Sequence, residues 1–170
     1  MSAIKTLNVT LPSDREITMT RVFDAPRTLV FDAFTKPKLV QRWLLGPDGW
    51  TMPTCEIDLR VGGKWRYVWR NDAEGREFAM SGVFREIARP DRTVHTEIYS
   101  EDPNQSEAVE TTTFKETGGK TTMTQTMLLP SKEVRDAIIA TGMSEGAGRS
   151  YDRLAEMLPE MAAEADTARA

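Results

Sequence analysis

Two residue types that build many functional sites are nearly missing from this sequence. Its 170 residues include one cysteine, Cys55, and one histidine, His95. A single cysteine cannot form a disulfide within the chain, and these two residues are too few for the cysteine and histidine arrays that bind zinc. The acidic residues do not have the spacing of an oxygen-ligand metal site, and there is no phosphate loop or dinucleotide fingerprint. We therefore expect no metal and no cofactor.

Long apolar runs and an excess of basic charge are also absent. No segment approaches the roughly 20 apolar residues of a membrane-spanning helix, and the first residues, MSAIKTLNVTLPSD, lack the apolar core of a signal peptide. The formal net charge is −4, which argues against a groove that follows nucleic-acid phosphates. The sequence therefore predicts a cytoplasmic protein that binds neither membranes nor nucleic acids.

The length and composition fit one globular domain. With 39% hydrophobic and 28% charged residues, 170 residues are enough to bury a core. We expect an N-terminal arm or edge strand over residues 1–13, the domain over residues 14–158, and a frayed tail over residues 159–170. Because exposed strand edges pair readily, a homodimer formed through the arm or a sheet edge is one hypothesis.

Alternation of apolar and polar residues predicts a series of strands joined by short turns. The first main strand covers residues 16–23 and is followed by two short helices, the second of which begins at Pro37. Six more strands are predicted over residues 52–59, 64–70, 77–87, 93–99, 107–116 and 121–129. Turns as short as Val61-Gly62-Gly63 join antiparallel neighbours. This order predicts an α+β protein in which one antiparallel sheet curves over a helix.

The best helical pattern in the sequence covers residues 131–158. Ser131 follows Pro130 and can cap the first turn, and apolar residues repeat along one face as far as Leu158. The middle of this face carries only small residues, among them Gly142 and Ala147. Two interpretations stay open: the helix breaks near Gly142 and packs closely beyond it, or one long helix covers a space with its small face.

Aromatic and methionine side chains gather on two of the predicted strands. Trp65, Tyr67 and Trp69 alternate along one strand, so their rings share a face, which is either plain core or the wall of a pocket. On the last strand Met123, Gln125 and Met127 share a face, and methionine adapts to variable contents.

The strand over residues 93–99 carries His95, Glu97 and Tyr99 on one face and Val94 and Ile98 on the other. Hydrophobicity alone predicts that Val94 and Ile98 point inward. The orientation matters, because a carboxylate near an imidazole would favour the imidazolium and could act with it as an acid or base.

An ordered set of motifs over about residues 16–158 resembles a known family. The motifs are FDAP at residues 23–26, VFDAF at 30–34, DLRVGGKW at 58–65, SGVFREI at 81–87, GMSEG at 142–146 and SYDRL at 150–154. With these motifs the chain is similar to the bacterial relatives of the Hsp90 ATPase activator C-terminal domain, within the START-like, Bet v 1-like (SRPBCC) superfamily. The resemblance implies the helix-grip fold, a curved antiparallel sheet of six to seven strands around a long C-terminal helix, with a cavity between them.

The resemblance also bears on individual residues. It implies that His95 and Glu97 face the cavity, which is the opposite of the orientation that hydrophobicity predicts. Many family members carry an aromatic residue where this chain has Ala147, so the smaller side chain is expected to enlarge the cavity.

Three functions remain open from the sequence. The first is a carrier or sensor that binds a small hydrophobic or amphipathic molecule in the cavity. The second is a protein-binding module that acts on a chaperone partner, as the family name implies. The third is an enzyme of the cyclase or hydrolase type with His95 and Glu97 as acid and base, which is less favoured because no nucleophile with an orienting base is evident. The residues expected to line the ligand site are Trp43, Trp65, Tyr67, Trp69, Met80, His95, Glu97, Tyr99, Met123, Gln125, Met127, Met143 and Ala147.

Overall fold

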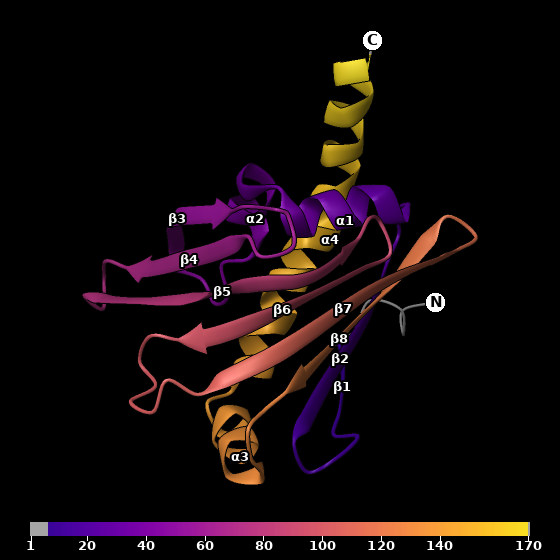
Figure 1. Cartoon of the computed structure of the whole chain (residues 1–170). Coiled ribbons are helices and arrows are strands. Elements are labelled where there is room, and N and C mark those ends of the chain that lie inside the picture. The colour runs from indigo at the N-terminus through magenta and orange to yellow at the C-terminus, as the bar shows by residue number, and fades with distance from the viewer. Residues whose placement is uncertain (1–6, 170) are drawn as a thin grey trace.

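The computed structural model of the protein describes residues 7–169 and contains one sheet and four helices (Figure 1). The helices are α1 (Arg27–Thr35), α2 (Pro37–Trp43), α3 (Lys132–Ala140) and α4 (Met143–Arg169). The strands are β1 (Asn8–Thr10), β2 (Glu16–Phe23), β3 (Thr51–Ile57), β4 (Lys64–Asn71), β5 (Arg76–Ala88), β6 (Arg92–Tyr99), β7 (Glu107–Thr117) and β8 (Lys120–Leu128). The seven main strands begin and end within two residues of the predicted positions.

All eight strands form one sheet in the order β1-β2-β8-β7-β6-β5-β4-β3, and each pair of neighbours is antiparallel. Figure 1 shows the sheet curved across α4, with α1 and α2 at one end of the molecule and α3 at the other. This arrangement confirms the α+β class and the helix-grip fold. None of the helices within residues 7–169 is long and apolar enough to span a membrane.

The sheet has eight strands rather than six to seven, because part of the N-terminal arm pairs with it. Asn8 to Thr10 form β1, in which Val9 lies opposite Met19 of β2. Residues 1–6, the start of the expected arm, lie outside the described residues. The edge strands are β1, which has three residues, and β3, which contains Pro53, so both edges are poor templates for further pairing. Dimerisation through an edge stays a prediction.

The segment over residues 131–158 forms two helices. Gly142 stands between α3 and α4 with a φ of +77°, a conformation that residues with a Cβ rarely adopt. Of the two interpretations of this segment, the break near Gly142 is therefore confirmed. The predicted cap is also present, since the Ser131 side chain accepts a hydrogen bond from the Val134 N–H at 3.2 Å.

The last helix does not end at Leu158. It passes through Pro159 and continues to Arg169, so the prediction of a frayed tail over residues 159–170 was wrong for the part that the structure describes. The physical reason is Met161, which extends the apolar face of α4 by one turn beyond Leu158 and is only 2% exposed.

The main core lies between the sheet, α1, α2 and α4. We use this name for the buried cluster formed by Phe23, Ala25, Val30, Phe31, Ala33, Trp43, Phe114, Met123, Tyr151, Leu154, Leu158 and Met161. A second cluster, the α3 cluster, contains Ile17, Ala108, Met127 and Leu129 and is covered by side chains of α3 and the start of α4. A third cluster contains Val40, Met52 and Trp69. The apolar interior is therefore divided rather than continuous.

Gly82 on β5 allows the Trp65 indole to lie across the sheet. Trp65 Nε1 donates a hydrogen bond to the carbonyl oxygen of Thr96 on β6, at 3.1 Å and two strands away. A Cβ at Gly82 would overlap that carbonyl oxygen and lie 2.7 Å from Trp65 Nε1. The missing side chain is thus a steric requirement for the position of Trp65.

We expect Gly82→Ala to lower the free energy of unfolding by about 3 kcal/mol, because the Cβ would overlap backbone that cannot move aside. Gly148→Ala is the matched control, since an added Cβ there meets nothing within 4 Å on helix α4. That change should raise stability by up to about 1 kcal/mol through helix propensity. Urea unfolding of both variants measures the difference, and equal stabilities would contradict the steric role of Gly82.

Candidate functional site

Polar side chains interrupt the apolar inner face of the two central strands. The inward residues of β7 are, in order, Ala108, Glu110, Thr112 and Phe114, and those of β8 include Met127, Gln125 and Met123. On each strand the polar residues stand between a member of the α3 cluster and a member of the main core. A polar band therefore crosses the sheet between the two apolar clusters.

A chain of hydrogen bonds runs through this band from α4 to β7. The Tyr151 hydroxyl donates to Gln125 Oε1, and Gln125 Nε2 donates to Glu110 Oε1 at 2.9 Å and to Thr112 Oγ1 at 3.4 Å. Tyr151, Gln125 and Glu110 are each less than 10% exposed. Because buried polar groups are costly unless they are paired, these bonds fix the rotation of α4 relative to the sheet.

His95 and Glu97 of β6 join the same band. His95 lies directly opposite Glu110 in the sheet, and its Nε2 is 3.7 Å from Glu110 Oε1. One nitrogen or oxygen atom from each of His95, Glu97 and Glu110 lies within 4.8 Å of the others. We call His95, Glu97, Glu110, Gln125 and Tyr151 the polar cluster.

The orientation of β6 agrees with the family resemblance and contradicts the hydrophobicity prediction. His95 and Glu97 face inward with their partners Glu110 and Ala108, so Val94 and Ile98 lie on the outer face. Neighbouring strands half-bury both outer side chains, and β-branched residues fit such a surface as well as they fit a core.

Loss of hydration governs the titration of the polar cluster. Burial raises the pKa of Glu97 to about 7, and burial together with the charge of Glu97 raises the pKa of Glu110 well above its ordinary value. Burial lowers the pKa of His95 to about 4. The expectation that a neighbouring carboxylate would favour the imidazolium was therefore wrong, because desolvation of the ring outweighs that attraction. At neutral pH His95 is uncharged.

An aromatic wall adjoins the polar cluster. Trp65, Tyr67 and Trp69 follow one another on the inner face of β4, with ring centroids 4.7 and 5.8 Å apart. The Trp65 ring also lies 5.0 Å from the His95 ring. Burial, followed by the charges of neighbouring groups that include Glu110, raises the pKa of Tyr67, so its hydroxyl stays protonated. The wall and the cluster together form an amphipathic inner surface.

The other predicted site residues lie in different surroundings. Met80 is opposite both Tyr67 and Tyr99 in the sheet and so belongs beside the aromatic wall. Tyr99 is at the end of β6, where its hydroxyl lies 3.5 Å from an Arg76 nitrogen. The remaining five divide between the apolar clusters: Trp43, Met123 and Ala147 pack in or against the main core, and Met127 and Met143 in or against the α3 cluster.

Three residues near the site were not singled out from the sequence. Glu110 and Tyr151 are members of the polar cluster, and Arg21 on the inner face of β2 is 3% exposed and forms an ion pair with Asp152 of α4 at 2.6 Å. The inward orientation of Glu110 could have been predicted from the sequence, because Glu110 alternates with Ala108 and Phe114 along the strand and so shares their face.

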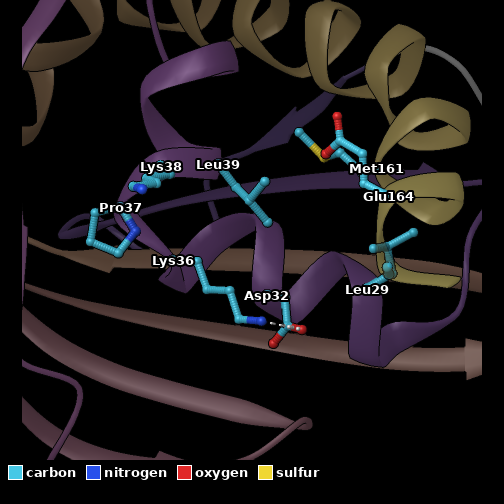
Figure 2. A pocket seen from close by; sticks show the side chains of 9 residues that line it. Leu29, Asp32, Lys36, Pro37, Lys38, Leu39, Met161 and Glu164 are labelled. Atoms are coloured by element: carbon cyan, nitrogen blue, oxygen red, sulfur yellow. Dashed lines mark ion pairs between the residues drawn. The ribbon is translucent and has the colours of Figure 1, made fainter. Parts of the chain in front are cut away.

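The hollows on the outside of the described part of the chain include two that lie away from the polar cluster. The larger, of about 430 Å³, lies between α1, α2 and the end of α4, and Figure 2 shows its lining with the ion pair between Asp32 and Lys36. It is lined by Leu29, Asp32, Lys36, Pro37, Lys38, Leu39, Met161, Glu164 and Ala165. The smaller, of about 370 Å³, is lined by Pro47, Glu145, Gly148, Arg149 and Asp152. Neither includes a residue of the polar cluster.

The curved antiparallel sheet around α4 defines a helix-grip protein of the START-like, Bet v 1-like class. Within that class, the family model described as "Activator of Hsp90 ATPase homolog 1-like protein" matches residues 24–159, and the chain belongs to this family. Comparison with curated protein sequences gives no significant match.

Solved structures agree with this assignment. A protein from Rhodobacter sphaeroides is 28% identical with a TM-score of 0.85, and the match covers 91% of this chain and 99% of that one. A protein from Nitrosomonas europaea is 27% identical with a TM-score of 0.77, covering 90% and 99%. An Hsp90 activator from Plasmodium falciparum is 23% identical with a TM-score of 0.53, covering 67% and 72%, and shows likeness of fold.

The raised pKa of Glu97 predicts a pH-dependent cost of burial. Between its unfolded pKa of about 4.5 and its folded pKa of about 7, the folded state holds a proton that the unfolded state has lost, so stability falls as pH rises through this window. Glu97→Gln removes this cost and should stabilise the protein by about 3 kcal/mol more at pH 8 than at pH 4.5.

Urea unfolding at both pH values measures this difference. Glu77→Gln is the control, because Glu77 is an exposed residue on β5 and its substitution should have the same effect at both pH values. An effect of Glu97→Gln that does not change with pH would contradict the electrostatic account of the site.

Proposed function

We propose that this protein binds a small hydrophobic or amphipathic molecule between the inner face of the sheet and α4, as a carrier or sensor. The observation that carries the proposal is the direct contact between the aromatic wall and the polar cluster. A core built only for stability gains nothing from two neighbouring buried carboxyl groups, whose desolvation is costly. A site for an amphipathic molecule needs both an apolar surface, such as the aromatic wall, and a polar one, such as the polar cluster.

The chemistry of the two surfaces suggests how such a molecule would lie. Its apolar part would pack on Trp65, Tyr67 and Trp69, with Met80 adapting to its shape. Its polar end would meet Glu97 and His95, neither of which makes a hydrogen bond through its side chain to another described residue. The ligand is therefore expected to carry at least one hydrogen-bond donor.

Entry of a ligand requires a part of the cover to move. The junction of α3 and α4 is suited to this, since Gly142 is exposed and an added Cβ there would meet nothing within 4 Å. Gly146 and Gly148 also give the first turns of α4 little side-chain volume. We infer that α3 and the start of α4 swing away from the sheet when a ligand enters.

Native mass spectrometry before and after denaturation would show whether a small molecule leaves on unfolding.

Affinity can be measured with the neutral fluorescent probe N-phenyl-1-naphthylamine. We expect Trp65→Leu and Trp69→Leu each to weaken its binding about tenfold, which corresponds to about 1.4 kcal/mol of lost aromatic contact. Trp43→Leu is the control: Trp43 lies in the main core, so stability should fall while probe affinity stays the same. If Trp65→Leu and Trp69→Leu both leave the probe affinity unchanged, the aromatic wall does not bind the probe and serves only as part of the packed core.

A second candidate function is the modulation of a chaperone. The family description and the likeness of fold to an Hsp90 activator from Plasmodium falciparum favour it. On this hypothesis, adding the protein to a bacterial Hsp90 homologue should change the rate of ATP hydrolysis, as a coupled ATPase assay would measure. No change at saturating concentration would reject it.

Catalysis is the third candidate. A neutral His95 and a Glu97 with a pKa near 7 are suited to exchange protons with a bound molecule at neutral pH. Since a bound substrate is needed first, this function would follow from ligand binding rather than replace it.

A further inference from the structure

Three side chains of the polar cluster are arranged as the ligands of a metal ion are. His95 and Glu97 are two residues apart on the inner face of β6, and Glu110 lies directly across from His95 on β7. The pairing of the two strands therefore sets the spacing of the three side chains. Rigid strands hold such a set more closely than loops would.

The distances are close to those of a bound ion. In a tetrahedral zinc site with bonds of about 2.0–2.2 Å, neighbouring ligand atoms lie about 3.4 Å apart. His95 Nε2 and Glu110 Oε1 are 3.7 Å apart, and all three ligand atoms lie within 4.8 Å of one another.

The surroundings favour a cation. Among the described residues, no lysine or arginine nitrogen lies within 4.0 Å of a carboxylate oxygen of Glu97 or Glu110. Two carboxyl groups this close cannot both carry a charge without compensation, so they need either a shared proton or a cation.

Further hydrogen bonds orient one of the ligating groups, the Glu110 carboxylate. Gln125 Nε2 donates to Glu110 Oε1, and the Tyr151 hydroxyl donates to Gln125 Oε1, so α4 fixes the position of this carboxylate. Partners that orient a ligating group in this way are typical of metal sites.

We propose that His95, Glu97 and Glu110 bind one divalent transition-metal ion, and that Zn²⁺ suits this set of ligands. One imidazole nitrogen and two carboxylate oxygens leave a fourth position for water. No metal was predicted from the sequence, because the three ligands come from two strands whose pairing is not evident from spacing along the chain. The proposal goes beyond the binding of a hydrophobic molecule and does not depend on it.

Zn²⁺ alone can be used to test the site, with chain that carries no histidine tag and has been stripped of metal by EDTA. Because His95 is the only histidine, its ring gives a single set of signals in a long-range ¹H–¹⁵N NMR spectrum. We expect one equivalent of Zn²⁺ per chain by calorimetry, with a large shift of one ring nitrogen of His95.

Glu97→Gln and Glu110→Gln keep the shape of the side chain and should each weaken Zn²⁺ binding at least tenfold. Two controls should bind Zn²⁺ as the original chain does: Cys55→Ser, which removes the only thiol, and Glu77→Gln, which removes an exposed carboxylate. Circular dichroism without Zn²⁺ checks that each variant is folded.

The proposal is overturned if the His95 signals do not move at millimolar Zn²⁺, which would leave a shared proton as the state of the carboxyl groups. Equal affinity in the original chain and both glutamine variants would overturn it too. If a variant does not fold, the NMR signals of His95 in the original chain still show whether Zn²⁺ binds at this site. Since no organic molecule is present, this outcome is independent of the result with the fluorescent probe.

Discussion

The burial of Gln125 is the constraint on which the rest of the structure depends. Its amide lies in the middle of the inner face of β8, where an unpaired polar group would cost about 1–3 kcal/mol. Both ends of the amide are therefore paired, with Tyr151 of α4 on one side and Glu110 of β7 on the other. An apolar helix face alone would allow α4 to rotate or slide along the sheet, whereas this pairing allows one position.

The division of the interior follows from the same band of polar groups. Aromatic rings pack in and against the main core, where Phe34 of α1 contacts the rings of Trp43 and Tyr151 at centroid distances of 4.8 and 6.1 Å. That side of the molecule, closed by α1 and α2, holds the fold together. The polar groups of β6, β7 and β8, which reduce stability, lie between this core and the α3 cluster.

Local periodicity made most of the fold predictable. Strands with one buried face alternate with a period of two, and this placed the main strands within two residues, while Ser131 marked the start of α3. The site was less predictable because it depends on pairing between distant segments. The hydrophobicity of Val94 and Ile98 gave the wrong face of β6, since both faces of a central strand are partly covered. The inward direction of Glu110 could be predicted from alternation, but its position opposite His95 depends on how β6 and β7 pair.

Two carboxyl groups this close in a buried site cannot both be ionised without compensation, and this links ligand chemistry to protons. The groups that face the site, His95 and the hydroxyls of Tyr67 and Tyr151, are uncharged at neutral pH, and the buried cation Arg21 is already paired with Asp152. A ligand that brings positive charge, whether a metal ion or an amine, must therefore displace the proton that Glu97 and Glu110 retain, and its affinity rises with pH until that proton is lost. A neutral apolar molecule displaces no proton, so its affinity is independent of pH over the same range. The pH dependence of binding thus distinguishes a ligand held by the carboxyl groups from one held by the aromatic wall.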